Sequence, residues 1–185
     1  MTSQRIGKYA CLEVECRYLL SKIPEGLLNN PKGWIITDHY FPNTRFRLRH
    51  MQSISGNEAI YKLTQKYRSE TQNAYETTVT NTYLTEAEYN LFEALEAKIL
   101  RKKRYSYPVQ NHSFSIDVFD GRHQGLILAE MELVERADAY EFVLPSFALK
   151  DVTNDPFFTG GNLIAMTDEE FRQGLLQRLR DHEKP

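Results

Sequence analysis

In several segments of this chain, charged side chains occupy every second position, with apolar or aromatic residues between them. Arg45, Arg47 and Arg49 alternate with Phe46 and Leu48. Successive side chains of a β-strand point to opposite faces, so such a segment predicts a strand with one charged and one apolar face. The alternation therefore favours a sheet whose two faces differ sharply in polarity.

Eight or nine segments have the β-branched and aromatic composition that is typical of strands. They are residues 8–20, 34–41, 45–51, 59–68, 74–84, 99–109, 113–119 and 126–134, with 141–144 as the ninth. Turn-forming residues separate many of them, as at Pro24–Pro31 and Ser53–Asn57. This number of strands with short connections predicts an antiparallel barrel or sandwich.

Two helices are predicted by capping boxes. Thr85 and Thr167 are each followed by a glutamate three residues later and then by apolar residues at helical spacing. The second box begins a C-terminal helix over residues 168–180, with acidic residues in its first turn and arginines in its last. The chain of 185 residues shows no internal repeat or linker, so we expect one domain over 1–185 with a core at about 8–165.

The charged strand faces are sorted by sign. Cations occupy three segments (Arg45, Arg47 and Arg49; Lys62 and Lys66; Lys102 and Arg104), and glutamates dominate two (Glu13 and Glu15, followed by Arg17; Glu130 and Glu132). On any single strand, charge is most simply the solvent-facing side of a half-buried strand. Sorting by sign, together with apolar residues on the opposite face, favours a barrel that holds the charges in its interior.

A charged interior predicts a polyanionic ligand and a metal. An unpaired buried charge costs several kcal/mol, so the charges must be paired, hydrated or neutralised. Arginine and lysine bind phosphate oxygens, and carboxylates from two strands suit Mg²⁺ or Mn²⁺ bridging to phosphates. The pattern indicates a polyphosphate bound together with a divalent cation.

Composition argues against several other classes. The formal net charge of −2 disfavours a general nucleic-acid binder, and no apolar stretch reaches the roughly 20 residues needed to cross a bilayer. The first residues lack the apolar region of a secretory signal, so we expect a cytoplasmic protein without membrane or nucleic-acid partners. Cys11 and Cys16 would point to opposite faces of one strand and are expected to stay as thiols.

The order of these motifs resembles the CYTH domains, or triphosphate tunnel metalloenzymes. Leu12-Glu-Val-Glu-Cys-Arg17 is similar to the ExExK signature, with arginine in place of the usual lysine. The other similar segments follow in family order: Ile36-Thr-Asp-His-Tyr-Phe41, Arg45-Phe-Arg-Leu-Arg49, Tyr61-Lys-Leu-Thr-Gln-Lys66, Lys102-Lys-Arg-Tyr105, Asp117-Val-Phe-Asp-Gly121, Gly125-Leu-Ile-Leu-Ala-Glu-Met-Glu132 and Asp151-Val-Thr153.

The resemblance implies a mainly β (α+β) fold: an eight-stranded antiparallel β-barrel whose tunnel binds triphosphate, with a few flanking helices. It implies metal ligands at Glu13, Glu15, Glu130 and Glu132, and substrate-binding cations at Arg17, Arg45, Arg47, Arg49, Lys62, Lys66 and Arg104. Tyr40 and Lys102 match a catalytic pair of the family's bacterial tripolyphosphatases. Asp117 either completes the metal shell or accepts hydrogen bonds from a tunnel arginine.

Three functions remain open at this point. The first is hydrolysis of a triphosphate with Mg²⁺ or Mn²⁺, with inorganic tripolyphosphate as first choice and a nucleoside or thiamine triphosphate as the other options. The second is a class IV adenylate cyclase that makes cyclic AMP from ATP. The third is a non-catalytic module that binds polyphosphate or a nucleotide. The sequence leaves open the physiological substrate, the number of metal sites and whether the barrel forms a homodimer.

Overall fold

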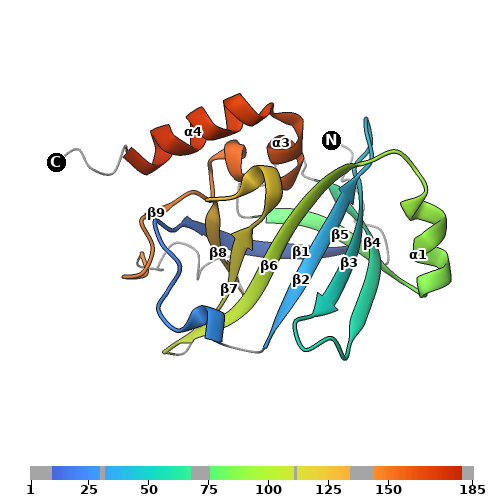
Figure 1. Ribbon diagram of the computed structural model, residues 1–185, viewed down its shortest axis with the longest axis horizontal. Coiled ribbons are helices and arrows are strands. Elements are labelled where there is room, and N and C mark those ends of the chain that lie inside the picture. The colour runs from blue at the N-terminus through green and yellow to red at the C-terminus, as the bar shows by residue number, and fades with distance from the viewer. Residues whose placement is uncertain (1–9, 30–31, 68–75, 111, 134–143, 181–185) are drawn as a thin grey trace, which may run out of the picture.

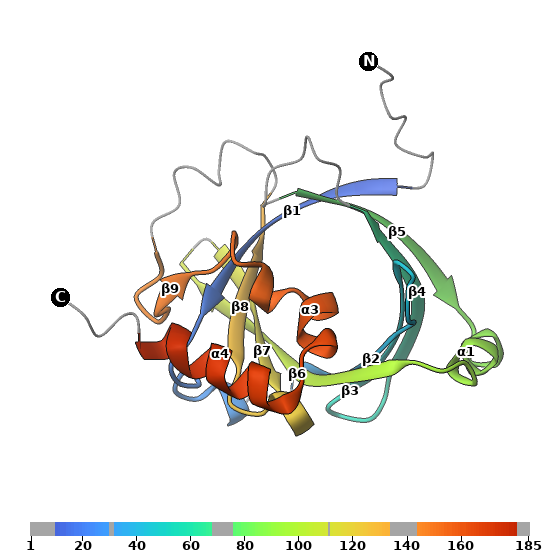
Figure 2. The ribbon, with the colours of Figure 1, turned by 90° about the horizontal axis from the view of Figure 1, so that it is seen from above.

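Eight antiparallel strands close into a barrel in the computed structural model, which describes residues 10–29, 32–67, 76–110, 112–133 and 144–180 (Figures 1 and 2). The strands are β1 (Ala10–Leu19), β2 (Gly33–Tyr40), β3 (Phe46–Ser53), β4 (Ala59–Tyr67), β5 (Glu76–Leu84), β6 (Lys98–Val109), β7 (His112–Phe119) and β8 (Ile127–Glu132). The predicted eight-stranded barrel is therefore confirmed.

The barrel closes through β1, which pairs with two different neighbours. Around the ring the order is β5-β4-β3-β2-β6-β7-β8-β1, and β1 returns to β5. Ala10 to Val14 pair with β5, and Glu15 to Leu19 pair with β8. Two further residues, β9 (Lys150–Asp151), extend the sheet beside the end of β1. The closed ring makes the charged side chains of β1, β2, β3, β4, β6 and β8 face a common interior.

The two predicted helices are present, and a third was missed. Both capping boxes form: α1 (Glu86–Glu93) begins after Thr85, and α4 (Asp168–Arg180) begins after Thr167. The short helix α3 (Gly160–Ala165) has no apolar periodicity that would predict it. Within the described residues there are also three 3₁₀ turns: η1 (Leu27–Asn29), η2 (Gly121–His123) and η3 (Pro156–Phe158). Of the predicted ninth strand, residues 141–143 lie outside the described residues.

Two apolar clusters pack on opposite sides of the barrel wall. One covers the outer faces of β1, β7 and β8, where Cys16, Phe114 and Met131 are buried. The other lies inside one end of the barrel and joins Leu128 to residues of η3, α3 and α4, among them Phe171. Burying one such side chain contributes about 1.5–3 kcal/mol. We call residues 155–180 the cap, because these packed residues attach them to that end of the barrel.

The cap covers only part of this end. Figure 2 shows α3 and α4 over the side of the ring formed by β6, β7 and β8, whereas β3, β4 and β5 lie away from them.

Of the helices in the described residues, none is long and apolar enough to cross a membrane.

Candidate active site in the barrel lumen

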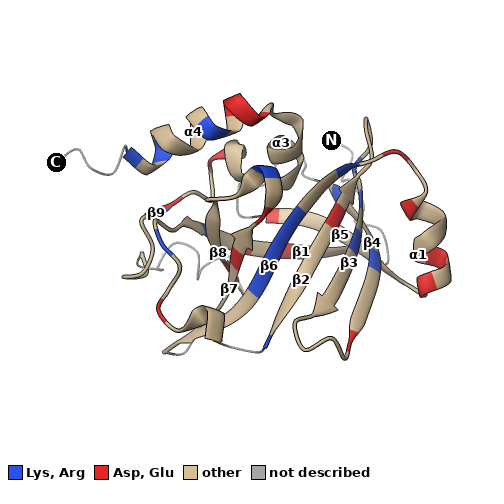
Figure 3. Cartoon of the chain, viewed as in Figure 1, with Lys and Arg blue, Asp and Glu red and all other residues tan. Residues whose placement is uncertain are grey.

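The barrel encloses a cavity of about 610 Å³ whose wall carries the alternating charges. Every charged residue that the sequence singled out lines it except Asp117; these are Glu13, Glu15, Arg17, Arg45, Arg47, Arg49, Lys62, Lys66, Lys102, Arg104, Glu130 and Glu132. Tyr40 also lines the cavity, as do residues 158–161 of the cap. Basic and acidic positions lie on neighbouring strands around the ring (Figure 3).

One part of the wall consists of cations that already have carboxylate partners. Lys102 Nζ donates to Asp117 Oδ2 at 2.5 Å, and Arg104 donates to both oxygens of Asp117 at 2.6 Å. Arg104 also donates to Glu130. Because Arg104 lies directly opposite Asp117 in the β6–β7 register, the sheet itself sets this contact.

Asp117 lies behind the cavity wall and is fully buried. Burial lowers the pKa of the Lys102 ammonium, although Asp117 opposes the shift. Burial alone would raise the pKa of Glu130, but Arg104 and Lys102 outweigh it and hold that pKa well below its ordinary value. Glu130 therefore stays ionised beside these cations, and Asp117 accepts hydrogen bonds from Lys102 and Arg104.

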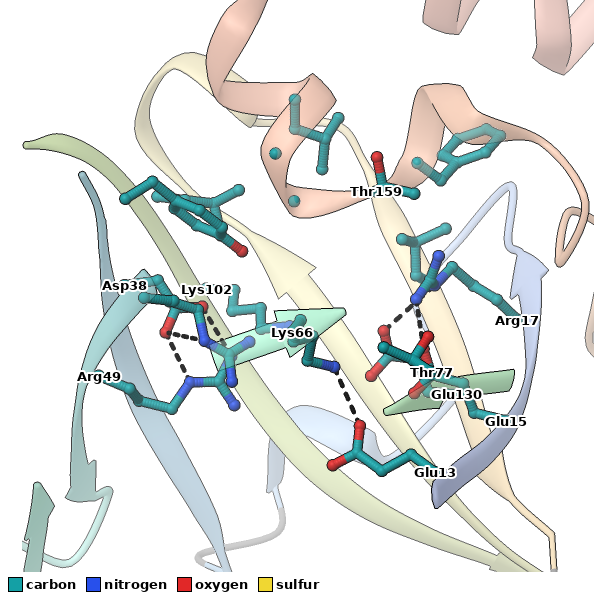
Figure 4. Close-up of a pocket in the computed structure, with 18 of the residues that line it drawn as sticks. Glu13, Glu15, Arg17, Asp38, Arg49, Lys66, Thr77, Lys102, Glu130 and Thr159 are labelled. Carbon is teal, nitrogen blue, oxygen red and sulfur yellow. Dashed lines mark hydrogen bonds and ion pairs between the residues drawn. The ribbon is translucent and has the colours of Figure 1, made fainter. Parts of the chain in front are cut away.

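Arg17 continues the same network across β1 (Figure 4). Its guanidinium donates to Glu15 at 2.6 Å and to Glu130 at 3.2 Å. Its backbone N–H donates to Thr153 Oγ1 at 2.8 Å, so Thr153 braces the strand and makes no contact of its own with the cavity. We call Arg17, Lys102 and Arg104, together with Glu15, Asp117 and Glu130, the paired wall.

Asp38 is a site residue that the sequence reasoning missed. Both its oxygens accept hydrogen bonds from Arg49 at 2.6 Å, and the carboxylate is 1% exposed. Burial would raise the pKa of Asp38, but Arg49 and Arg47 outweigh it and lower that pKa. The signal was present, because Asp38 alternates in phase with Tyr40 and lies opposite Arg49 in the sheet.

Three cations on the facing strands lack such a partner. Arg47 makes one long ion pair, with Nε 3.7 Å from Asp38 Oδ1, and its Nη2 donates to Thr64 Oγ1 at 3.3 Å, but its buried Nε has no hydrogen-bond partner. Arg45 lies over the ring of Tyr67, 5.2 Å from the centroid. Lys62 makes no ion pair with any described residue. Burial, and then Arg49 and Arg47, lower the Lys62 pKa to about 8. We call Arg45, Arg47 and Lys62 the open wall.

The carboxylates of β1 and β8 fit a divalent cation. Glu15 and Glu132 lie directly opposite each other in the β1–β8 register, and like charges in that position destabilise a sheet unless a cation lies between them. Glu132 is exposed to the cavity and has no ion-pair partner in the described residues. Those residues contain no group of three histidine, cysteine or acidic side chains arranged around one point. A pair of carboxylates such as Glu15 and Glu132 nevertheless suits Mg²⁺, which is usually held by one or two carboxylates and by substrate phosphates.

Glu13 and Lys66 connect the two sides of the cavity. Lys66 Nζ on β4 donates to Glu13 Oε2 on β1 at 3.0 Å, and both side chains remain partly exposed. This pair is the weakest-held of the lumen's short ion pairs, because water still reaches both partners.

Tyr40 and Lys102 both line the cavity but bond to different groups. The Lys102 ammonium donates to Asp117, and the Tyr40 ring lies against Gly160 of the cap. Burial raises the pKa of the Tyr40 phenol, so its hydroxyl keeps its proton at neutral pH. The two residues predicted as a catalytic pair thus share the lumen without sharing a hydrogen bond.

Comparison with known proteins agrees with this architecture. No family model matches the chain. An inorganic triphosphatase from Acetivibrio thermocellus is 27% identical over 78 residues, which is 42% of this chain and 49% of the relative, so the match spans about half the relative's length.

Solved structures show the same fold. The inorganic triphosphatase NE1496 superposes with a TM-score of 0.56 at 23% identity, over 84% of this chain and 95% of that one. The PH1819 protein of Pyrococcus horikoshii OT3 gives 0.50 at 18% identity, over 70% and 82%. The closed barrel and its charged lumen are the architecture that the resemblance to CYTH, or triphosphate tunnel, domains implied, and part of the sequence is similar to a triphosphatase.

Proposed function

We propose that this protein is a divalent-metal-dependent triphosphatase that cleaves the terminal phosphoanhydride of inorganic tripolyphosphate. One observation carries the proposal: three cations without a close carboxylate partner face the carboxylates of β1 and β8 across one cavity. An arginine whose buried Nε has no partner is costly unless an anion completes it. A polyphosphate between the open wall and a metal would satisfy both sides at once.

The open wall binds the phosphates in this scheme. The planar guanidinium of Arg47 offers paired donors to phosphate oxygens, and Lys62 offers a compact charge. Phosphoryl transfer spreads negative charge over the equatorial oxygens, so cations fixed around them lower the barrier. At 4 Å and an effective dielectric of 20, one charge pair contributes about 4 kcal/mol before desolvation.

The paired wall positions the reacting end. Lys102, held by Asp117, offers its ammonium to the leaving or bridging oxygen, where negative charge develops. Asp117 acts here as the acceptor that fixes Lys102 and Arg104, which is the second of the two roles the sequence left open. Tyr40, protonated at neutral pH, donates a hydrogen bond at the cap side of the cavity.

Glu132 and Glu15 would hold Mg²⁺ or Mn²⁺, with Glu13 and Glu130 orienting metal-bound water. The metal would neutralise phosphate charge and help to orient the attacking water. Glu15 and Glu130 also accept from Arg17, so that arginine fixes their carboxylates on the β1–β8 side of the lumen.

The direct test is phosphate release from tripolyphosphate, ATP and thiamine triphosphate, with Mg²⁺, with Mn²⁺ and with a chelator. We expect metal-dependent release, fastest from tripolyphosphate; a cavity of about 610 Å³ also accommodates organic triphosphates, which is why they belong in the panel. Glu132→Gln should abolish release while circular dichroism stays unchanged, because Glu132 makes no contact that the fold needs.

Two results would replace the proposal. Cyclic AMP formed from ATP would identify a cyclase. Tight triphosphate binding without turnover in any metal would identify a binding module.

A further inference from the structure

The first turn of α3 approaches Tyr40 so closely that it leaves no room for a side chain. A Cβ placed on Gly160 would lie 1.9 Å from Tyr40 Oη and 2.8 Å from its Cζ. Real Cβ atoms do not approach other atoms within 3.0 Å, so either the ring or the helix would have to move. At the next residue, Gly161, a Cβ would meet nothing within 4 Å.

The cap is anchored by several contacts. His123, fully buried in η2, contacts the Leu163 carbonyl through Nε2 at 3.0 Å. Arg178 of α4 donates to both oxygens of Asp155 and lies 4.1 Å above the centroid of the Phe157 ring. Leu163 itself is 1% exposed. The β7–β8 connection therefore holds α3 directly, and Arg178 joins α4 to η3, which precedes α3.

The Tyr40 ring, in contrast, has the cavity beside it. Tyr40 lines the lumen, and Arg47 is its direct neighbour in the β2–β3 register. A group added at Gly160 would turn the ring into the space that we assign to phosphate.

We propose that Gly160 is a positioning residue. Because it has no side chain, the first turn of α3 can pack directly against Tyr40 and fix the position of its hydroxyl. The inference rests on the proposed function in so far as Tyr40 takes part in turnover. The contact itself can be tested by measuring Tm, without an activity assay.

The experiment compares Gly160→Ala with Gly161→Ala in the full chain. Both replace glycine by alanine in the first turn of the same helix, where alanine is the better helix former. We expect Gly161→Ala to raise Tm by about 2 °C, from the helix preference and the size of the chain. Gly160→Ala should melt about 3 °C or more below Gly161→Ala, because strain cancels the helical gain.

The same pair is then measured with Tyr40→Leu, which lacks all three ring atoms within 4 Å of the Gly160 Cβ position. In that background the two alanine variants should change Tm equally, because the coupling partner is gone. Equal Tm values with Tyr40 intact, or an unchanged difference in Tyr40→Leu, would overturn the inference whether or not the protein hydrolyses triphosphate.

Turnover provides the second measurement. With tripolyphosphate, Gly160→Ala should lower kcat by about 10- to 100-fold, as expected for a reacting group displaced by about 1 Å, and change KM by less than about 3-fold. Gly161→Ala, which also adds a methyl group at the cavity wall, should lower kcat much less than Gly160→Ala does. A loss of kcat shared by both variants would assign the effect to the cap as a whole and would contradict a specific role for Gly160.

Discussion

The paired wall and the open wall of the lumen carry the same residue types in opposite electrostatic situations. Arg104 contacts Asp117 and Glu130, whereas Arg47, two strands away around the same cavity, has a buried Nε without a hydrogen-bond partner. In the paired wall the protein supplies the counter-charges. In the open wall the proposed polyphosphate would supply them.

The difference separates residues that maintain the fold from residues that maintain affinity. Removing one member of a buried pair leaves the other charge uncompensated, which is strongly destabilising. Removing a partly buried cation that has no close counter-charge relieves a cost that the folded protein already bears. Substitutions on the two walls should therefore move stability and activity independently.

The largest effect on stability is expected for Arg104→Ala. The change leaves Asp117 and Glu130 buried without their main cation, and we expect a loss of about 3–5 kcal/mol in unfolding free energy. Urea unfolding followed by circular dichroism measures it. Arg101→Ala is the matched control, because Arg101 lies on the exposed outer face of the same strand and should change stability by less than about 0.5 kcal/mol. Equal losses in both variants would show that the paired wall does not support the fold.

Arg47→Gln should show the reverse behaviour. We expect tripolyphosphate turnover to fall by about 100-fold or more, the usual effect of deleting one donor to transition-state charge. Tm without ligand should stay constant or rise. With tripolyphosphate and metal, the Tm increase seen for the wild type should shrink in Arg47→Gln. A drop in Tm comparable to that of Arg104→Ala would place Arg47 in the paired wall instead.

The sequence predicted which side chains face the lumen but not which of them pair. Alternation assigned Arg45, Arg47 and Arg49 to one face, and the barrel places all three on the cavity. Pairing depends on the register between strands, which no single segment contains. Arg49 was therefore assigned to substrate, whereas the β2–β3 register gives it Asp38 as a bidentate partner.

The cap shows the second limit of the sequence. Residues 160–165 contain two glycines and lack a periodic apolar face, so local propensity does not predict α3. Tertiary packing of Leu163 and the anchor at His123 hold this turn in place. A helix defined by such distant contacts, and with it the contact between Gly160 and Tyr40, becomes visible only in the folded chain.

The pH dependence of the unfolding free energy tests whether Lys62 belongs to the open wall. Its folded pKa of about 8 lies below the model-peptide value, so between about pH 8 and 10.5 the folded protein binds fewer protons than the unfolded chain. Stability therefore rises with pH across this window. Lys62→Met should be the more stable protein at pH 7, by roughly 1–2 kcal/mol once the shift is discounted for partial exposure, and the difference should vanish near pH 10.5. A difference that stays constant from pH 7 to 10.5 would mean that the charge of Lys62 costs the fold nothing.

The smallest effect is expected where the two walls meet. The Lys66–Glu13 bond of 3.0 Å joins β4 to β1, but both side chains are about one-third exposed. Glu13→Gln should therefore cost less than about 1 kcal/mol in unfolding free energy, and 1 M salt should remove most of that loss because it screens exposed charges.

The same variant also tests whether Glu13 competes with phosphate for Lys66 or holds Lys66 in position for phosphate. Phosphate must displace Glu13 from Lys66, so without metal Glu13→Gln should bind tripolyphosphate more tightly than the wild type in isothermal titration calorimetry. With Mg²⁺ the loss of a metal-side carboxylate should lower turnover. Weaker binding in both conditions would instead mean that Glu13 holds Lys66 in the geometry that phosphate requires. In that case this pair would belong to the paired wall, and the open wall would end at Arg45, Arg47 and Lys62.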